Sequence, residues 1–237
     1  MKEVEAAIHT KVESMVAKNT LFAFLNDESL TATERLSRLA PSLAYFVLGF
    51  YDLQHLILKY PAAEVKTDRI KRAINAHCAE DSTHWPWFLT DLKTLGMDKE
   101  TTYTSAIRYL WGKANQMQRW SCYQFAILAD RAIDPILRYA FLLSIEINGR
   151  AVFSKFLEIA DRSEEETGKE LLYFGRRHFA RETGGLHGEE EIENELLEMD
   201  LDPETKSKAL VIAMKALEIQ DVEWNELGRA GYANKKW

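Results

Sequence analysis

The chain has 237 residues, of which 46% are hydrophobic and 28% are charged. This composition is typical of a globular protein with a substantial core, so it argues against intrinsic disorder. Since 30 basic residues face 37 acidic ones, the net charge is −7, which disfavours nucleic acid and anionic membrane surfaces as partners.

The amino terminus and the cysteines indicate a compartment. Glu3 and Glu5 stand where a signal peptide would carry a basic flank, so we expect a cytoplasmic protein. The longest apolar run, residues 43–50, is shorter than the roughly 20 residues that cross a bilayer, so we expect no membrane span. Cys78 and Cys122 are far apart and form no CxxC pair, which fits a reducing compartment.

Apolar residues recur at helical spacing along almost the whole chain, and no stretch alternates strictly as a strand would. We therefore predict an all-α protein. Thr31 and Glu34 form a capping-box pattern at the start of one helix. In chain order, the expected helices cover about residues 3–18, 21–25, 31–60 with a bend near Pro41, 67–95 with a kink at Pro86, 103–130, 134–160, 164–183 and 203–227, with a further short helix between 184 and 202.

The connections between these helices are short. No Gly/Ser-rich or Pro-rich linker divides the chain, and no repeat of fixed period occurs. We therefore expect a single domain, residues 1–237, folded as a closed helical bundle.

The segment with the clearest chemical content is residues 74–85. On a helix, His77, Asp81 and His84 are spaced by four and three residues, and Glu80 lies four residues before His84, so these side chains share one face. Such a face can supply nitrogen and oxygen ligands to a metal ion. A solvated face or an ordinary ion pair is the alternative explanation.

Two further segments repeat this chemistry. His178 and Glu182 are four residues apart, and Glu146 is the only charged residue between Tyr139 and Asn148. A buried carboxylate must be protonated, paired or bound to a metal, and Arg150 is a candidate partner for Glu146.

A fourth helix offers Asp52 and His55 in an otherwise apolar stretch. No glycine-rich phosphate loop, nucleophile elbow or zinc-protease helix is present in the sequence, so those enzyme classes are disfavoured.

The run from His77 to Gly96 resembles the third-helix signature of the heme-oxygenase-like diiron oxidases. Residues 19–25, with Asn19-Thr20-Leu21-Phe22, are similar to the entry of that superfamily, and the order acid-x-x-His, lone Glu, His-x-x-x-acid is preserved. The resemblance implies a heme-oxygenase-like bundle of about seven to eight helices. It also implies an enzyme that uses O2 at two irons to oxidise a small carboxylic acid or amine.

The resemblance also implies a ligand set. Its members are Asp81 or Glu80, His84, Glu146, His178 and Glu182, with Asp52 in the place of a glutamate from helix two. Gly185 stands where the family has a second histidine, so either His187 substitutes or the second iron is weakly held or absent. Manganese is an alternative to iron, and Arg176 or Arg177 would hold a substrate carboxylate.

Other functions stay open at this point. The chain can be a metal-free binding or regulatory protein that retains the fold. His9 lies in a segment similar to that of the proximal ligand of heme oxygenases. Thiaminase-II-type hydrolases use a cysteine nucleophile in a pocket lined by carboxylate and tyrosine; Cys122 and Tyr123 are the residues of those types here, but no adjacent base is evident. A homodimer is neither indicated nor excluded by the sequence.

Overall fold

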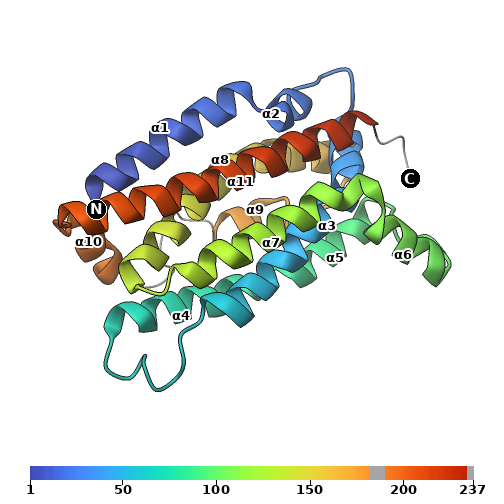
Figure 1. The fold of residues 1–237 in the computed structure, drawn as a ribbon. Coiled ribbons are helices and arrows are strands. Elements are labelled where there is room, and N and C mark those ends of the chain that lie inside the picture. The colour runs from blue at the N-terminus through green and yellow to red at the C-terminus, as the bar shows by residue number, and fades with distance from the viewer. Residues whose placement is uncertain (182–189, 234–237) are drawn as a thin grey trace.

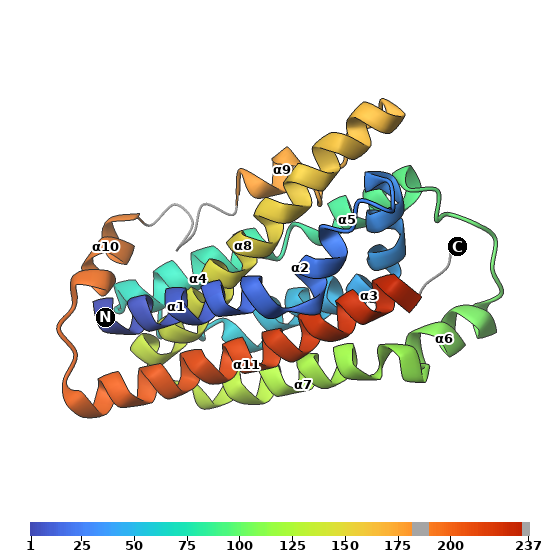
Figure 2. The ribbon, with the colours of Figure 1, turned by 90° about the horizontal axis from the view of Figure 1, so that it is seen from above.

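The computed structural model describes residues 1–181 and 190–233, and every regular element in this part of the chain is a helix, which confirms the all-α prediction. Figures 1 and 2 show an elongated bundle whose long helices, such as α1, α7 and α11, lie along its length. In chain order the elements are α1 Lys2–Lys18, α2 Thr20–Leu25, α3 Ala32–Asp52, the π-helix η1 Leu53–Leu58, α4 Arg69–Asp81, α5 Trp85–Thr94, α6 Tyr103–Trp111, the 3-10 helix η2 Lys113–Asn115, α7 Gln116–Arg131, α8 Pro135–Thr167, α9 Arg176–Phe179, α10 Glu190–Glu198 and α11 Pro203–Ala233.

The two longest helices, α8 and α11, pack against each other. Helix α11 contacts α1, α2, α3, α7 and α8, and in both views it runs beside α1 and, in the opposite direction, beside α7 (Figures 1 and 2). The side chain of Asp134 caps the start of α8, which ends at Gly168 with a φ of 69° that favours glycine. A Cβ on Gly228 would lie 2.5 Å from the backbone nitrogen of Leu21, so the close contact of α11 with α2 requires glycine.

Helix α3 differs from its expected form at its end. The capping box of Thr31 and Glu34 is present, and the helix passes through Pro41 without interruption. At Leu53 the chain continues as the π-helix η1 rather than as an α-helix to residue 60. Within η1 the side chain of Gln54 is fully buried, so this turn directs a polar group into the core.

Two expected helices are each divided in two. The helix expected over 67–95 consists of α4 and α5, because Pro86 lies in the first turn of a new helix, where its missing N–H is tolerated. The helix expected over 103–130 is interrupted by Gly112 and η2 before α7 begins. Helix α6, which ends at Gly112, has no buried residue and extends beyond the bundle (Figures 1 and 2).

The prediction of one helix over 164–183 is wrong, because residues 168–175 are not helical. Residues up to Thr167 belong to α8, the following segment to Gly175 is not helical, and α9 spans only Arg176–Phe179. The physical reason is that Gly168 ends α8, after which the backbone N–H groups of residues 172–174 bind the Asp91 carboxylate instead of forming helical bonds.

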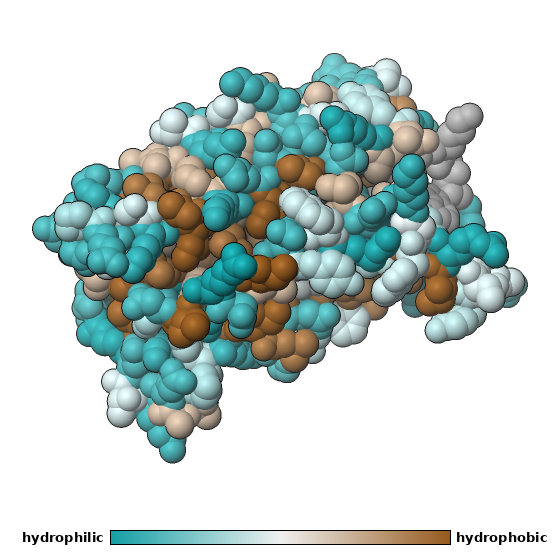
Figure 3. All heavy atoms as spheres, in the orientation of Figure 1, coloured by the Kyte–Doolittle hydropathy of each residue, from teal (hydrophilic) through white to brown (hydrophobic). Residues whose placement is uncertain are grey.

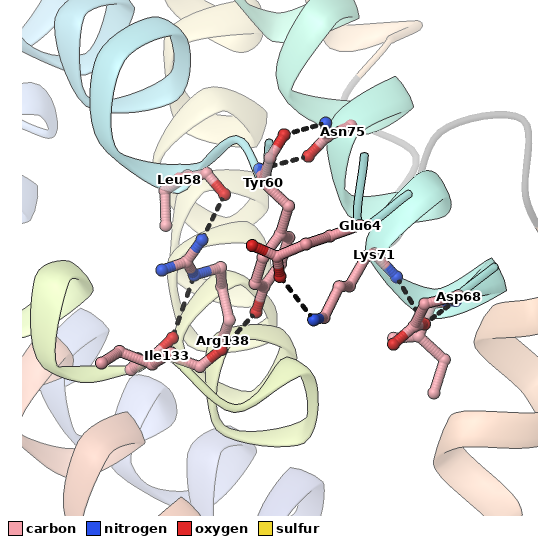
Figure 4. A network of polar contacts seen from close by, with 10 residues as sticks. Leu58, Tyr60, Glu64, Asp68, Lys71, Asn75, Ile133 and Arg138 are labelled. Atoms are coloured by element: carbon pink, nitrogen blue, oxygen red, sulfur yellow. Dashed lines mark hydrogen bonds and ion pairs between the residues drawn. The ribbon is translucent and has the colours of Figure 1, made fainter. Parts of the chain in front are cut away.

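A buried polar network fixes α4 against α8 and the end of η1 (Figure 4). Arg138 donates to the carbonyl oxygens of Leu58 at 2.7 Å and Ala132 at 2.9 Å, and its guanidinium lies 4.1 Å from the centre of the Tyr60 ring. The backbone of Tyr60 exchanges two hydrogen bonds with the Asn75 side chain, at 2.7 and 2.9 Å. We call these groups the Arg138 network.

No helix in the described ranges combines the length and the apolar character that a membrane span requires. Apolar residues do gather on the face formed by α7 and α11 (Figure 3). The exposed large apolar side chains of these two helices are Trp120, Tyr123, Ile127, Val211, Val222 and Tyr232.

Candidate metal centre

Four of the expected ligands line one cavity inside the bundle. Asp81 ends α4, His84 lies in the turn before α5, Glu146 lies in the middle of α8, and His178 lies on α9. All four side chains are buried. The cavity has a volume of about 30 Å³, close to the space that one water molecule occupies. Its other lining residues are mostly apolar and aromatic: Phe46, Val47, Phe50, Tyr51, Trp85, Ile145, Gly149, Phe153 and Tyr173.

His77 joins the carboxylates of α4 and α8. Its Nε2 atom lies 3.2 Å from Oδ2 of Asp81 and 3.4 Å from Oε1 of Glu146, and the imidazole is fully buried. Burial by itself would lower the pKa of His77, but the two adjacent carboxylates outweigh it and raise the pKa well above its usual value. In the absence of a metal ion, His77 is therefore an imidazolium held between two carboxylates.

Gln54 orients the Asp81 carboxylate. The Nε2 amide of this fully buried glutamine donates to Oδ2 of Asp81 at 2.7 Å. The π-helical turn η1 brings Gln54 to this position. π-Helical turns often occur at functional sites, because the extra residue redirects a side chain.

His84 forms a second pair with Glu80. The Nε2 atom of His84 lies 3.1 Å from Oε1 of Glu80, which also lies 3.8 Å from a guanidinium nitrogen of Arg181. The His84 ring stacks on Trp87, with 4.8 Å between ring centres, and its centre lies 4.7 Å from that of the His178 ring. Both histidine rings are therefore held in place by aromatic neighbours.

His178 is held by the irregular segment that precedes it. Its Nδ1 atom lies 2.9 Å from the carbonyl oxygen of Tyr173, whose ring stacks on the imidazole at 4.4 Å. The edge of the Phe153 ring completes this contact at 4.3 Å. Since a carbonyl oxygen can only accept, Nδ1 carries the proton in the neutral ring and Nε2 keeps its lone pair.

The donor atoms fit a metal ion of the iron or manganese kind. One ligand atom each from His77, Asp81 and Glu146 lie within 4.8 Å of one another, and the same holds for Glu80, Asp81 and His84. Both groups combine imidazole nitrogen with carboxylate oxygen, which suits iron and manganese. Asp81 belongs to both groups, so one carboxylate connects the two sets of donors.

Other expected site residues lie elsewhere. Asp52 is at the end of α3 and lines a different cavity beside Cys122, so the structure does not bring it to His84 or Glu146. The reason is that the chain changes from α-helix to the π-helix η1 directly after Asp52. This change places Gln54, rather than Asp52, next to Asp81. Glu182 and His187 lie outside the described residues.

Three arginines were named in the sequence analysis as partners, Arg150 for Glu146 and Arg176 or Arg177 for a substrate carboxylate. Glu146 contacts His77, a partner that the sequence analysis did not name, and Arg150 is exposed. Arg176 forms ion pairs with Asp161 and Glu164 on α8. Arg177 lies over the Trp87 ring at 4.8 Å, and neither arginine lines the cavity.

Sequence reasoning placed His77 on the right face but did not choose it as a ligand, and it missed Gln54. The four-residue spacing between His77 and Asp81 could have indicated His77 as a ligand. No pattern in the sequence indicates Gln54, because its burial depends on the π-helical turn.

The residues behind the two other resemblances do not line this cavity. His9 is exposed on α1, as a surface histidine would be. The Cys122 thiol donates to the carbonyl oxygen of Tyr45 at 3.4 Å, and burial raises its pKa to about 12. Such a thiol is protonated at neutral pH and is a poor nucleophile.

Comparison with known proteins adds no family to this description. No protein-family model matches the sequence, and no curated protein matches it. The functional conclusion therefore depends on the buried imidazoles and carboxylates themselves.

Proposed function

We propose that this chain is a non-heme iron protein that uses O2 to oxidise a small carboxylic acid or amine. Asp81, His84, Glu146 and His178 would hold the ion, with Glu80 and His77 beside them. Manganese is the alternative ion, and a second ion would need donors from the part of the chain that contains Glu182 and His187.

One observation carries the proposal. Imidazoles and carboxylates from α4, α8, α9 and the turn before α5 line the same buried cavity, although they are far apart in the sequence. Helical bundles that bind iron through carboxylates and histidines use this arrangement of inward-facing donors. A purely structural cluster has no need of a cavity at its centre.

The chain's own residues have distinct tasks in this proposal. Gln54 fixes one oxygen of Asp81, and the Tyr173 carbonyl fixes the ring of His178. The rings of Phe46, Phe153 and Tyr173 line the cavity and limit the access of water. A ferrous ion bound there would activate O2, and the organic substrate that is oxidised would supply the net electrons that reduce the O2.

Metal analysis is the direct test. We expect purified protein, reconstituted with ferrous iron without oxygen and then desalted, to retain about one ion per chain. His84→Ala, Glu146→Gln and His178→Ala should each lower the retained iron. His9→Ala and His55→Ala are matched controls, because both histidines are exposed and neither lines the cavity.

The iron-loaded protein should then consume O2 when a suitable acid or amine from a panel is added. No iron or manganese above background, in the wild type after reconstitution, would reject the proposal. Retained iron that is equally high in the His84→Ala and His178→Ala variants would place the ion elsewhere.

A second candidate is a metal-free binding or regulatory protein. Its support is that the cluster contains contacts that need no ion: His77 pairs with Asp81 and Glu146, His84 with Glu80, and His178 with the Tyr173 carbonyl. For this candidate we expect no retained metal, and an unchanged affinity for its ligand in the His84→Ala variant.

A further inference from the structure

Asp91 is a buried acid on α5 that belongs to none of the metal-binding groups described above. Its side chain is fully buried and accepts hydrogen bonds from three consecutive backbone N–H groups. Oδ1 accepts from Leu172 at 2.7 Å, and Oδ2 accepts from Tyr173 at 2.8 Å and from Phe174 at 3.0 Å. The carboxylate therefore fixes the peptide groups of residues 172–174, which have no helical partners.

The segment that Asp91 holds is the one that holds His178. The Tyr173 carbonyl faces the Nδ1 atom of His178 at 2.9 Å, and the backbone N–H of His178 donates to the Leu172 carbonyl at 3.2 Å. Both carbonyls belong to residues whose N–H groups bind Asp91. A displacement of this backbone would therefore move the acceptor that sets the orientation of the imidazole.

We propose that Asp91 is a positioning residue for His178. Through the backbone of residues 172–174 it holds the imidazole with the proton on Nδ1, which leaves the lone pair of Nε2 for the cavity. That this lone pair serves a metal ion rests on the proposed function, whereas the orientation and the tautomer do not. Groups that orient a metal-binding histidine in this way commonly change metal affinity by about 10- to 100-fold.

The first measurement uses the wild-type protein without metal. Histidine labelled with ¹⁵N allows NMR to assign the protonated ring nitrogen of each histidine. We expect His178 to carry its proton on Nδ1 at a pH where the ring is neutral. A proton on Nε2 in the wild type would overturn the proposal, whatever the behaviour of any variant.

The second measurement uses Asp91→Asn in the full chain. An amide keeps the shape of the carboxylate but places an NH2 group opposite backbone N–H donors, so at least one of the three bonds is lost. We expect the His178 signals to change from one tautomer to a mixture, and the affinity for Mn²⁺ alone to fall by about 10- to 100-fold.

The matched control is Asp202→Asn. Asp202 also accepts from two backbone N–H groups, those of Glu204 and Thr205, at 3.0 and 3.1 Å, but it caps α11, which carries none of the expected ligands. This variant should keep the His178 tautomer and the Mn²⁺ affinity of the wild type. A folded Asp91→Asn protein with the wild-type tautomer would overturn the proposal.

The two proposals fail in different ways. If the wild type binds no metal but Asp91→Asn alters the His178 tautomer, the positioning role stands and the oxidase proposal fails. If the wild type binds iron and Asp91→Asn leaves both tautomer and affinity unchanged, the oxidase proposal stands and the positioning role fails.

Discussion

Two buried polar clusters contact α4, and their partners differ in kind. In the Arg138 network, the charged guanidinium is satisfied by backbone carbonyl oxygens and by the Tyr60 ring. In the centre around His77, the partners are ionisable side chains, Asp81 and Glu146, and both of these carboxylates also line the cavity. Burial of a charge therefore does not by itself indicate a functional site; the chemistry of its partners does.

This comparison predicts that substitutions in the two clusters affect different properties. Those in the Arg138 network should change stability, and those in the centre around His77 should also change metal binding. Arg138→Leu should lower the free energy of unfolding by about 4 kcal/mol, because two buried carbonyls lose their donor. Urea denaturation measures the loss, and the iron content of the folded fraction should not change. Arg131→Leu, an exposed arginine at the end of α7, is the control and should lie within about 0.5 kcal/mol of the wild type.

Glu223 sharpens the comparison, because it is buried on α11 and has no hydrogen-bond partner among the described residues. Burial raises its pKa to about 8 from a usual 4.5. The folded protein therefore keeps a proton that the unfolded chain loses above pH 4.5, so stability falls as pH rises from 4.5 towards 8.

We expect the Glu223 carboxyl to contribute a loss of roughly 2.5 kcal/mol between pH 5 and pH 7. Glu223→Gln should remove this part of the pH dependence in denaturation experiments, whereas Glu226→Gln on the same helix should not. An equal slope in the wild type and in Glu223→Gln would contradict the assignment.

His77 provides a third test, in the metal-free protein. Its pKa is raised in the folded state by Asp81 and Glu146. The stabilisation is therefore complete below the usual histidine pKa of about 6.5 and is lost as pH rises through the higher folded value.

Glu146→Gln should reduce stability at pH 6, because the charged His77 loses one of its two carboxylate partners, and the difference from the wild type should shrink at alkaline pH. Glu158→Gln, at a more exposed position of α8, is the control. A difference that does not vary with pH would show that His77 is not charged in the folded protein.

The smallest expected effect concerns the Tyr60 hydroxyl, which donates to the Ile133 carbonyl at 2.9 Å. Tyr60→Phe removes this bond but keeps the ring beneath Arg138, so we expect a loss of about 1 kcal/mol. Tyr123→Phe, on an exposed ring of α7, should cost nothing measurable. Neither variant should alter iron binding.

The sequence predicted the local features of this fold well. Helical spacing gave the fold class, and the capping box at Thr31 is present, because both depend on neighbouring residues. The face shared by Asp81 and His84 is also local, and it forms one wall of the cavity. The helix breaks at Gly168 and before Pro86 carried signals in the sequence as well, but their effect on chain direction depends on distant contacts.

The parts that the sequence did not predict depend on tertiary structure. Gln54 reaches Asp81 only because of the π-helical turn, and Asp52 faces another cavity for the same reason. The segment before His178 looks helical by composition, but the Asp91 carboxylate provides its backbone N–H groups with a different partner. No spacing rule within one segment describes a competition of that kind.

The helices that carry the residues lining the cavity differ in length. α3, α4 and α8 are helices of at least 13 residues, whereas His178 stands on α9, which has four. Short segments open more readily than long helices, and they do so without unfolding the rest of a protein. We therefore expect an ion or a small molecule to enter from this side, while the long helices α4 and α8 keep Asp81 and Glu146 in place.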